Sequence, residues 1–461
     1  MSTSSSRSTL VRTEIRVTGA LASIFALRMF GLFMILPVFA VFGAALPGAT
    51  PFLIGLAVGA YGLMQALLQL PFGMLSDRFG RKPLILAGLV LFACGGVVAA
   101  TAETIQGVIL GRALQGAGAV AAVIMALVAD VVSEQHRTRA MAAVGMSVGG
   151  AFVLALILGP LLATWLALSG LFWLSSLLAV GGLLVALAWV PNPAVRVREA
   201  QLPLGPRLLR ILKDPLLLRL NSGIFVLHAV LTACFVVVPG LLSERLGLPL
   251  ARHSLLYLVV FLASFVAMVP LIIASERRGL RPVMALAVLL LGVALVLLAL
   301  AGDRLWWFGL ALFVFFTGFN LLEALLPSLV GRAAPVGTRG TALGIYSSSQ
   351  FLGVFVGGGL GGWLLQQYGP ETVFLAAAAL TAGWLLLVFG MPPLAKLDNR
   401  VLPLVVAADE ADRWVNELLA VDGVLEAVVL PEAGIALLKV DPASVDEAAL
   451  TRLSGDVVAQ V

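Results

Sequence analysis

The chain has 461 residues, of which 61% are hydrophobic and only 11% are charged, with a mean hydropathy of +1.08 and a net charge of +5. Soluble proteins contain about 45–50% apolar and about 25% charged residues, so this composition excludes an ordinary soluble protein and indicates a chain that lives in a bilayer. The two cysteines, Cys94 and Cys234, each lie inside an apolar run. Their spacing favours neither a metal site nor a disulfide framework, and we expect no cofactor and no metal.

Twelve apolar runs are long enough to cross the roughly 30 Å hydrocarbon core as helices, with their backbone amides bonded internally. The sequence therefore predicts an all-α membrane region. The expected spans are 17–43, 52–75, 83–102, 105–132, 139–165, 168–190, 217–241, 253–275, 282–301, 305–331, 339–366 and 370–391.

Lysine and arginine are distributed unequally among the connections between these spans. If the N-terminus is cytoplasmic, fifteen of them lie in cytoplasmic connections, and only Arg245, Arg252 and Arg304 lie in the opposite ones. Basic loops are retained on the cytoplasmic side. We therefore expect a multi-pass protein of a bacterial inner (plasma) membrane, with both termini in the cytoplasm.

A charged motif occurs twice, 199 residues apart. Residues 77–83 (DRFGRKP) return as residues 276–282 (ERRGLRP), with the acid, the bases, the glycine and the proline in the same places. Such a parallel repeat predicts two homologous six-helix bundles, 1–190 and 217–392. The connection between them, 191–216, is expected to be a cytoplasmic linker.

The linker and the C-terminal region differ in character from the spans. Residues 204–213 alternate basic and apolar side chains at helical spacing, which predicts an amphipathic helix lying on anionic membrane lipids. Residues 401–461 carry 3 basic and 11 acidic side chains, whereas residues 1–400 carry 26 and 13. The pattern over 393–461 predicts a small α+β, ferredoxin-like domain of order βαββα(β), whose last strand would be 457–461.

The chain resembles the major facilitator superfamily. Residues 73–83 (GMLSDRFGRKP) match its most specific loop signature, residues 110–118 look like an element of its fourth helix, and Gly159-Pro160 is similar to its antiporter element, although the paired glycines expected next are absent. Segments of spans one, ten and eleven, with the C-terminal domain, look like the YajR subfamily. The resemblance implies the superfamily's fold of two six-helix bundles around a central cavity.

The resemblance and the repeat together suggest a gating function for the charged loops. An acid at the membrane boundary interacts with the positive N-terminal end of a helix for about 0.3–2 kcal/mol. We expect Asp77 to contact the start of span eleven, and Glu276 the start of span five, so that both contacts close the cytoplasmic side. The alternative is that the basic residues serve only to keep these loops on the cytoplasmic side. The expected gating residues are Gly73, Asp77, Arg78, Gly80, Arg81, Lys82, Glu276, Arg277 and Arg281.

Four ionisable side chains lie inside predicted spans, where each costs several kcal/mol unless it is paired or hydrated. In the superfamily, spans one, four, seven and ten line the cavity, which implies that Arg28, Arg112, His228 and Glu323 face water or substrate. We expect Glu323 to carry a proton, with His228 as second candidate. Arg28 would bind an anionic group or balance a titrating acid.

Each of these roles has a structural alternative. Arg28 and Glu323 could form a permanent ion pair, Arg112 could bond backbone carbonyls of an adjacent helix, and His228 could be an ordinary core residue. The amides of Asn320 and Gln115 are expected to supply hydrogen bonds at the same depth.

Glycines form small-residue stripes on two spans. Gly353, Gly357 and Gly361 lie on span eleven, with Gly358 and Gly362 beside them, and Gly145 and Gly149 begin a weaker stripe on span five. Small residues let helices approach closely. Because these two spans face the opposite half in the superfamily, we expect both stripes to lie at a rocking interface.

Together these features predict a transporter that is not an enzyme, since the sequence has no nucleotide-binding glycine loop or hydrolase motif. The leading hypothesis is a proton-coupled secondary transporter that exports drugs or metabolites by proton antiport and alternating access. The alternatives are a proton-coupled uptake symporter and a transport-inactive receptor that uses the C-terminal domain. We expect a monomer whose partners are a small-molecule substrate and protons, with no nucleic acid, because the C-terminal domain lacks basic charge and sheet aromatics.

Overall fold

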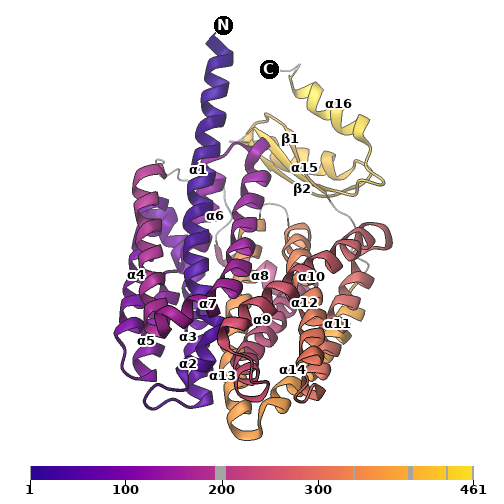
Figure 1. The fold of residues 1–461 in the computed structure, drawn as a ribbon. Helices are drawn as coiled ribbons and strands as arrows, with labels where there is room; N and C mark the ends of the chain where they lie inside the picture. Colours follow the sequence, from indigo (N-terminus) through magenta and orange to yellow (C-terminus); the bar gives the residue numbers. More distant parts are fainter. Residues whose placement is uncertain (1, 193–203, 336–337, 393–397, 432–433, 459–461) are drawn as a thin grey trace.

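Two helical bundles stand side by side, and a small α+β domain lies over one end of them (Figure 1). The N-terminus and C-terminus lie at that same end. This arrangement confirms the expected fold class. The computed structural model describes residues 2–192, 204–335, 338–392, 398–431 and 434–458.

The N-terminal bundle contains the first six spans, although the helices do not coincide with them one to one. Span one divides at Met34 and Ile35, just before Pro37, whose missing amide donor suits the first turn of a helix. Span four divides at Gly118. Spans five and six run together, with a break at Ala167, where φ is 52°. The helices are α1 (Ser2–Phe33), α2 (Leu36–Gly43), α3 (Pro51–Phe79), α4 (Arg81–Thr101), α5 (Ile105–Ala117), α6 (Ala121–Val131) and α7 (Glu134–Trp189).

The C-terminal bundle contains the other six spans and follows a short helix in the linker. This linker helix, α8 (Leu204–Lys213), is followed by Asp214, whose carboxylate accepts hydrogen bonds from the amides of Leu216 and Leu217 and so caps the next helix. The remaining elements are α9 (Pro215–Gly240), the π-turn η1 (Leu241–Arg245), α10 (Leu250–Arg278), α11 (Leu280–Leu300), α12 (Leu305–Ala333), α13 (Arg339–Tyr368) and α14 (Pro370–Phe389).

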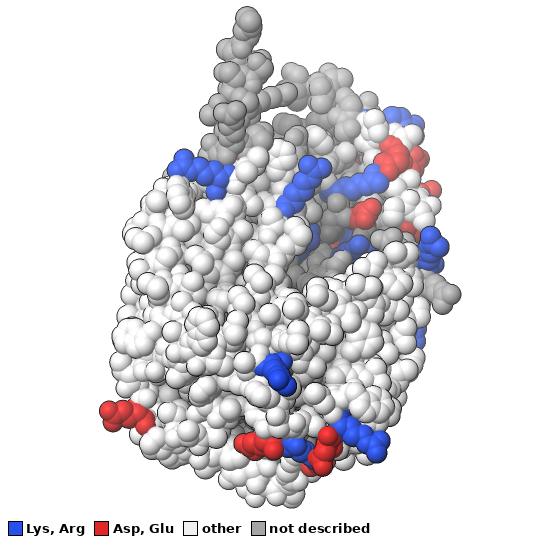
Figure 2. All heavy atoms as spheres, in the orientation of Figure 1, with Lys and Arg blue, Asp and Glu red and all other residues white. Residues whose placement is uncertain are grey.

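Ten helical segments of the described chain are long and apolar enough to cross a membrane. One of them, 139–189, contains spans five and six on either side of the break. The helix of span eleven, α13, is not one of these ten segments, although its 30 residues are long enough to cross the membrane. The space-filling view agrees with a membrane region, because charged side chains gather toward the two ends and the broad middle is almost free of them (Figure 2).

The repeat seen in the sequence is also a repeat of backbone geometry. Gly80 joins α3 to α4 with φ 94° and ψ 154°, and Gly279 joins α10 to α11 with φ 90° and ψ 158°. Only glycine enters this region readily. Next to them, Lys82 donates to the carbonyl of Val190 at the end of span six, and Arg281 donates to the carbonyl of Phe389 at the end of span twelve. The two donors, Lys82 and Arg281, are 199 residues apart in the sequence, and so are the two acceptors, Val190 and Phe389.

The C-terminal domain has a three-stranded antiparallel sheet of order β1-β3-β2. The fourth strand expected at 457–461 is wrong where it can be checked, because Val457 and Val458 belong to a helix. Leu450, Leu453 and Val457 recur at helical spacing, which favours a continuous helix over a strand. The elements are β1 (Asp398–Pro403), η2 (Ala408–Glu410), α15 (Ala411–Leu419), β2 (Val424–Leu430), β3 (Ile435–Val440) and α16 (Glu447–Val458).

Candidate transport site

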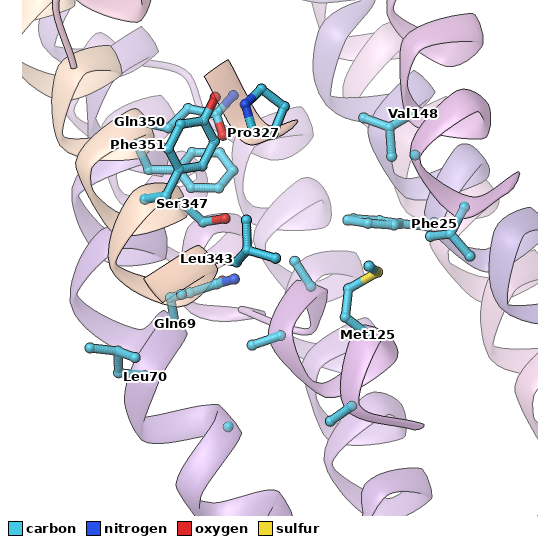
Figure 3. A pocket seen from close by; sticks show the side chains of 18 of the residues that line it. Phe25, Gln69, Leu70, Met125, Val148, Pro327, Leu343, Ser347, Gln350 and Phe351 are labelled. Carbon is cyan, nitrogen blue, oxygen red and sulfur yellow. The ribbon is translucent and has the colours of Figure 1, made fainter. Parts of the chain in front are cut away.

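A cavity of about 1400 Å³ lies between the two bundles and is lined by residues of both. Its lining extends to Asp77 and Arg81 at one end of α3 and α4, and to Gly340 at the start of α13. In Figure 3, Gln350 and Phe351 of α13 face Phe25 of α1 across this space. The cavity therefore reaches the end of the molecule that carries the basic repeat loops.

The other end of the molecule is closed by close contact between α3 and α13. A Cβ atom on Gly55 would overlap the carbonyl oxygen of Gly358, and one on Gly358 would overlap that of Gly55. One turn further, a Cβ atom on Gly362 would overlap the backbone of Pro51. Backbone contact this close leaves no passage between these two helices, and the described residues that line the cavity include none from the connections at this end.

The glycines of the two stripes lie only in part where the sequence suggested. Gly353 and Gly357 of α13 pack against α9 of their own half, and the cross-half contacts belong to the neighbouring Gly358 and its partners on α3, which is span two. Gly145 and Gly149 of α7 meet open space within 4 Å and line the cavity. The expectation was wrong for Gly353 and Gly357 and right for Gly358, because a sequence shows a small-residue face but not which neighbour covers it.

Glu323 lies in the cavity wall on α12, within a small polar cluster. The amide of Gln350 donates to His228 Nε2 at 2.8 Å and lies 3.5 Å from Glu323 Oε1. Glu323 Oε2 is 3.9 Å from His228 Nε2 and has no hydrogen-bond partner among the described residues. With the amide nitrogen placed as the donor, His228 Nε2 acts as the acceptor, a role that belongs to the neutral imidazole. Asn320 lies outside this cluster, where it donates to Ser264 Oγ at 3.1 Å.

Arg28 does not face the cavity. Its side chain is completely buried, and Nη2 donates to Tyr61 Oη at 2.8 Å and to Gln65 Oε1 at 2.9 Å. The expectation that it would contact water or substrate is therefore wrong for this conformation. Its described contacts contain no acid, so the alternative of an ion pair with Glu323 is not found either. The depth of a residue along a helix can be read from the sequence, but the direction of its side chain cannot.

Arg112 lies in the cavity wall on α5. Its Nε donates to the carbonyl of Ala57 at 3.4 Å, which is the backbone contact that the sequence allowed as an alternative. Its Nη1 donates to Gln115 Oε1 at 3.1 Å, and the amide of Gln115 donates to Ser175 Oγ at 3.0 Å. Gln115 thus holds Arg112 in place and does not itself line the cavity.

Three polar side chains on α3 form a hydrogen-bonded ladder that was not predicted from the sequence as one group. Tyr61, Gln65 and Gln69 recur every four residues, so they share one face of the helix. Gln65 Nε2 donates to Gln69 Oε1 at 2.8 Å, and Tyr61 Oη lies 3.2 Å from Gln65 Oε1. Through Gln69 the ladder reaches the cavity (Figure 3). The four-residue spacing of polar groups in an apolar span was the signal that could have revealed it.

The gating residues of the first repeat contact one another. Arg81 Nη1 lies 2.5 Å from Asp77, its Nε donates to Asp130 Oδ2 at 2.9 Å, and its Nη1 donates to Ser76 Oγ at 2.6 Å. The side chain of Asp77 is 66% exposed. The expected contact of Asp77 with the start of span eleven is thus replaced here by one within its own half, since the cavity separates the two.

The other gating positions lie around the same end. Arg78 and Arg277 are exposed, and Gly73 lines the cavity. Lys82 and Arg281 bind the ends of spans six and twelve, as described above. The side chain of Glu276 lies outside the described residues.

Comparison with known proteins places this geometry in a family. The model of the Major Facilitator Superfamily matches residues 21–269 and 220–407. The inner membrane transport protein YajR of Escherichia coli (strain K12) is 45% identical over 433 residues, which are 93% of this chain and 94% of that protein.

Two further proteins extend the comparison. A transporter of Buchnera aphidicola (subsp. Acyrthosiphon pisum) is 34% identical over 347 residues, covering 75% of this chain and 89% of its own. The solved structure of the nucleoside transporter NupG aligns with a TM-score of 0.65 over 81% of this chain and 99% of its own, at 15% identity. At that identity, the structural match speaks for the fold alone.

Proposed function

Because this chain belongs to the major facilitator superfamily and is a membrane transporter of that family, we propose that it exports amphiphilic small molecules from a bacterial cell in exchange for protons, by alternating access. The location in the inner membrane follows the name of the E. coli relative. The supporting observation is the position of Glu323, a carboxylate in the wall of a large cavity that reaches only one end of the protein.

Alternating access is supported by the contrast between the two ends. One end holds the cavity, and the other is closed by backbone contact between α3 and α13. With the basic loops on the cytoplasmic side, this conformation is inward-open. Rocking the bundles to close the cytoplasmic end would separate Gly55 from Gly358 and open the periplasmic end.

Glu323 can couple this motion to protons because its carboxylate has few partners. Gln350, His228 and Tyr346 are polar neighbours of this carboxylate, and none of the three carries a positive charge in this arrangement. A carboxylate in such surroundings is stabilised by a proton or by a donor group of the substrate. Competition between the two for Glu323 makes the transport an exchange.

The test is proton movement in vesicles that contain the purified protein and a pH-sensitive dye. A compound that a thermal-shift screen identifies as a ligand should drive proton flow opposite to its own transport. Glu323→Gln, which preserves the shape of the side chain, should abolish the coupled proton flow, and the exposed Glu103→Gln should not. Proton flow in the same direction as the compound would establish the uptake symporter instead.

A further inference from the structure

The ionisable side chains of the cavity wall differ in whether a charge of opposite sign accompanies them. Arg81 is matched by Asp77 and Asp130. Arg112 has no carboxylate among its described contacts, which are a carbonyl and an amide. The acidic, basic and histidine side chains that line the cavity are Asp77, Arg81, Arg112, Asp130, His228 and Glu323. Arg112 is therefore the uncompensated cation of this wall, as far as the described residues show.

A second guanidinium stands close behind the first. The Cζ atom of Arg112 is 5.2 Å from the ring centroid of Tyr61, and that of Arg28 is 5.9 Å from the same centroid. Arg28 Nε and Nη1 are buried without a hydrogen-bond partner among the described residues. Both positive charges thus act on one region of the wall, around Tyr61.

Two positive charges without a counter-charge are unfavourable in this buried position. Removing a charge from water is costly when no opposite charge accompanies it. Their ring contacts with Tyr61 and Phe92 recover only part of that cost. An anion in the cavity beside Tyr61 would feel both charges in a space whose other walls are mainly apolar.

We propose that Arg112, reinforced by Arg28 behind the ring of Tyr61, forms an anion subsite that takes the carboxylate of an amphiphilic substrate. This inference rests on the proposed function, because it names the substrate class of the same cavity. The planar guanidinium suits a carboxylate. The apolar part of the substrate would lie against the side chains of Phe25, Met125 and Val148 (Figure 3).

The subsite is separate from the proton site. The rings of Tyr61 and Phe351 lie 6.0 Å apart, and the residue before Phe351, Gln350, contacts Glu323. Arg112 lies on α5 of the N-terminal half and Glu323 on α12 of the C-terminal half, and no bond joins the two among the described residues. A substrate that places its carboxylate at Arg112 leaves Glu323 available for a proton or for a donor group elsewhere on the same molecule.

The test compares two compounds of nearly the same shape, the anion 4-phenylbutyrate and its neutral amide 4-phenylbutanamide. Binding to the purified full-length protein in detergent is measured by titration at constant ionic strength. The acid should bind about ten-fold more tightly or better, as expected for a charge-assisted hydrogen bond. Arg112→Gln should remove this preference, and Arg304→Gln, which removes an exposed arginine at the opposite end, should leave it intact.

A second variant separates loss of the subsite from loss of the fold. Arg112→Lys keeps the charge without the planar fork, so a reduced preference for the acid should remain. Equal binding of acid and amide to the wild-type protein would overturn the proposal, and so would an unchanged preference in folded Arg112→Gln. The result is independent of the proposed proton exchange, since no gradient is present. If the acid preference holds but vesicles show no proton coupling, only the exchange mechanism fails.

Discussion

At the scale of single residues, the charges of the first repeat at the mouth of the cavity pair with one another. Asp77, Arg81 and Asp130 satisfy one another within the N-terminal half. No bond among these three crosses to the other bundle. A carboxylate that is 66% exposed remains able to exchange this partner for another when the cytoplasmic end closes.

Asp77→Asn tests that exchange. If the carboxylate binds the start of span eleven in the closed state, its loss should slow transport by about two- to thirty-fold, the factor that 0.3–2 kcal/mol represents. Thermal stability should barely change, because an exposed ion pair contributes little. Asp303→Asn breaks a comparable exposed pair with Arg245 at the opposite end and serves as the control. Equal transport rates in both variants would count against the gating role.

At the scale of elements, α13 has two different glycine faces. Gly353 and Gly357 let it lie against α9 in its own half, and Gly358 lets it meet α3 of the other half. The first contact lies within one bundle, and in the proposed alternating-access cycle the second would separate when the closed end opens. The stripe as such was visible in the sequence, but the division between its two faces was not.

Gly358→Ala should shift the protein away from the inward-open state. The added methyl group would overlap the carbonyl oxygen of Gly55, whereas Gly359→Ala on the same helix meets nothing within 4 Å. A cysteine introduced at Ala122 in the cavity, with Cys94→Ser to remove the exposed thiol, reports the change. Its labelling by a polar maleimide should fall in Gly358→Ala and stay constant in Gly359→Ala. Equal labelling in all three proteins would contradict the assignment of this contact as the closed gate.

At the scale of the whole molecule, the C-terminal domain touches the transport machinery directly. Lys439 of β3 is almost fully buried, and its Nζ donates to the carbonyls of Ala333 and Ala334 at 3.0 and 3.3 Å. These carbonyls end α12, the helix that carries Glu323. A lysine at a helix C-terminus is favoured by the helix dipole, so the domain is positioned to sense or restrain the movement of α12.

Deleting residues 393–461 separates a transporter from a receptor. A transporter should keep part of its transport rate without this domain, whereas a receptor that acts through it should lose all function. Lys439→Met, which leaves the domain present, should change the rate in the same direction as the deletion, and Arg452→Met on the exposed face of α16 should not. The measurement is the initial rate in vesicles. If Lys439→Met matches the wild-type rate while the deletion does not, the docking contact is not the route of coupling.

The sequence by itself determined the membrane region, the two related halves, the family and the presence of four ionisable groups at depth. These follow from composition, from apolar run length and from a motif repeated after 199 residues, all of which act along one chain. The tertiary structure alone decided that Arg28 turns away from the cavity while Arg112 lines it, that α13 meets α3, and that Lys439 reaches α12. These contacts depend on the rotation of each helix about its axis and on the neighbour that covers each face, which are settled only when the helices pack together.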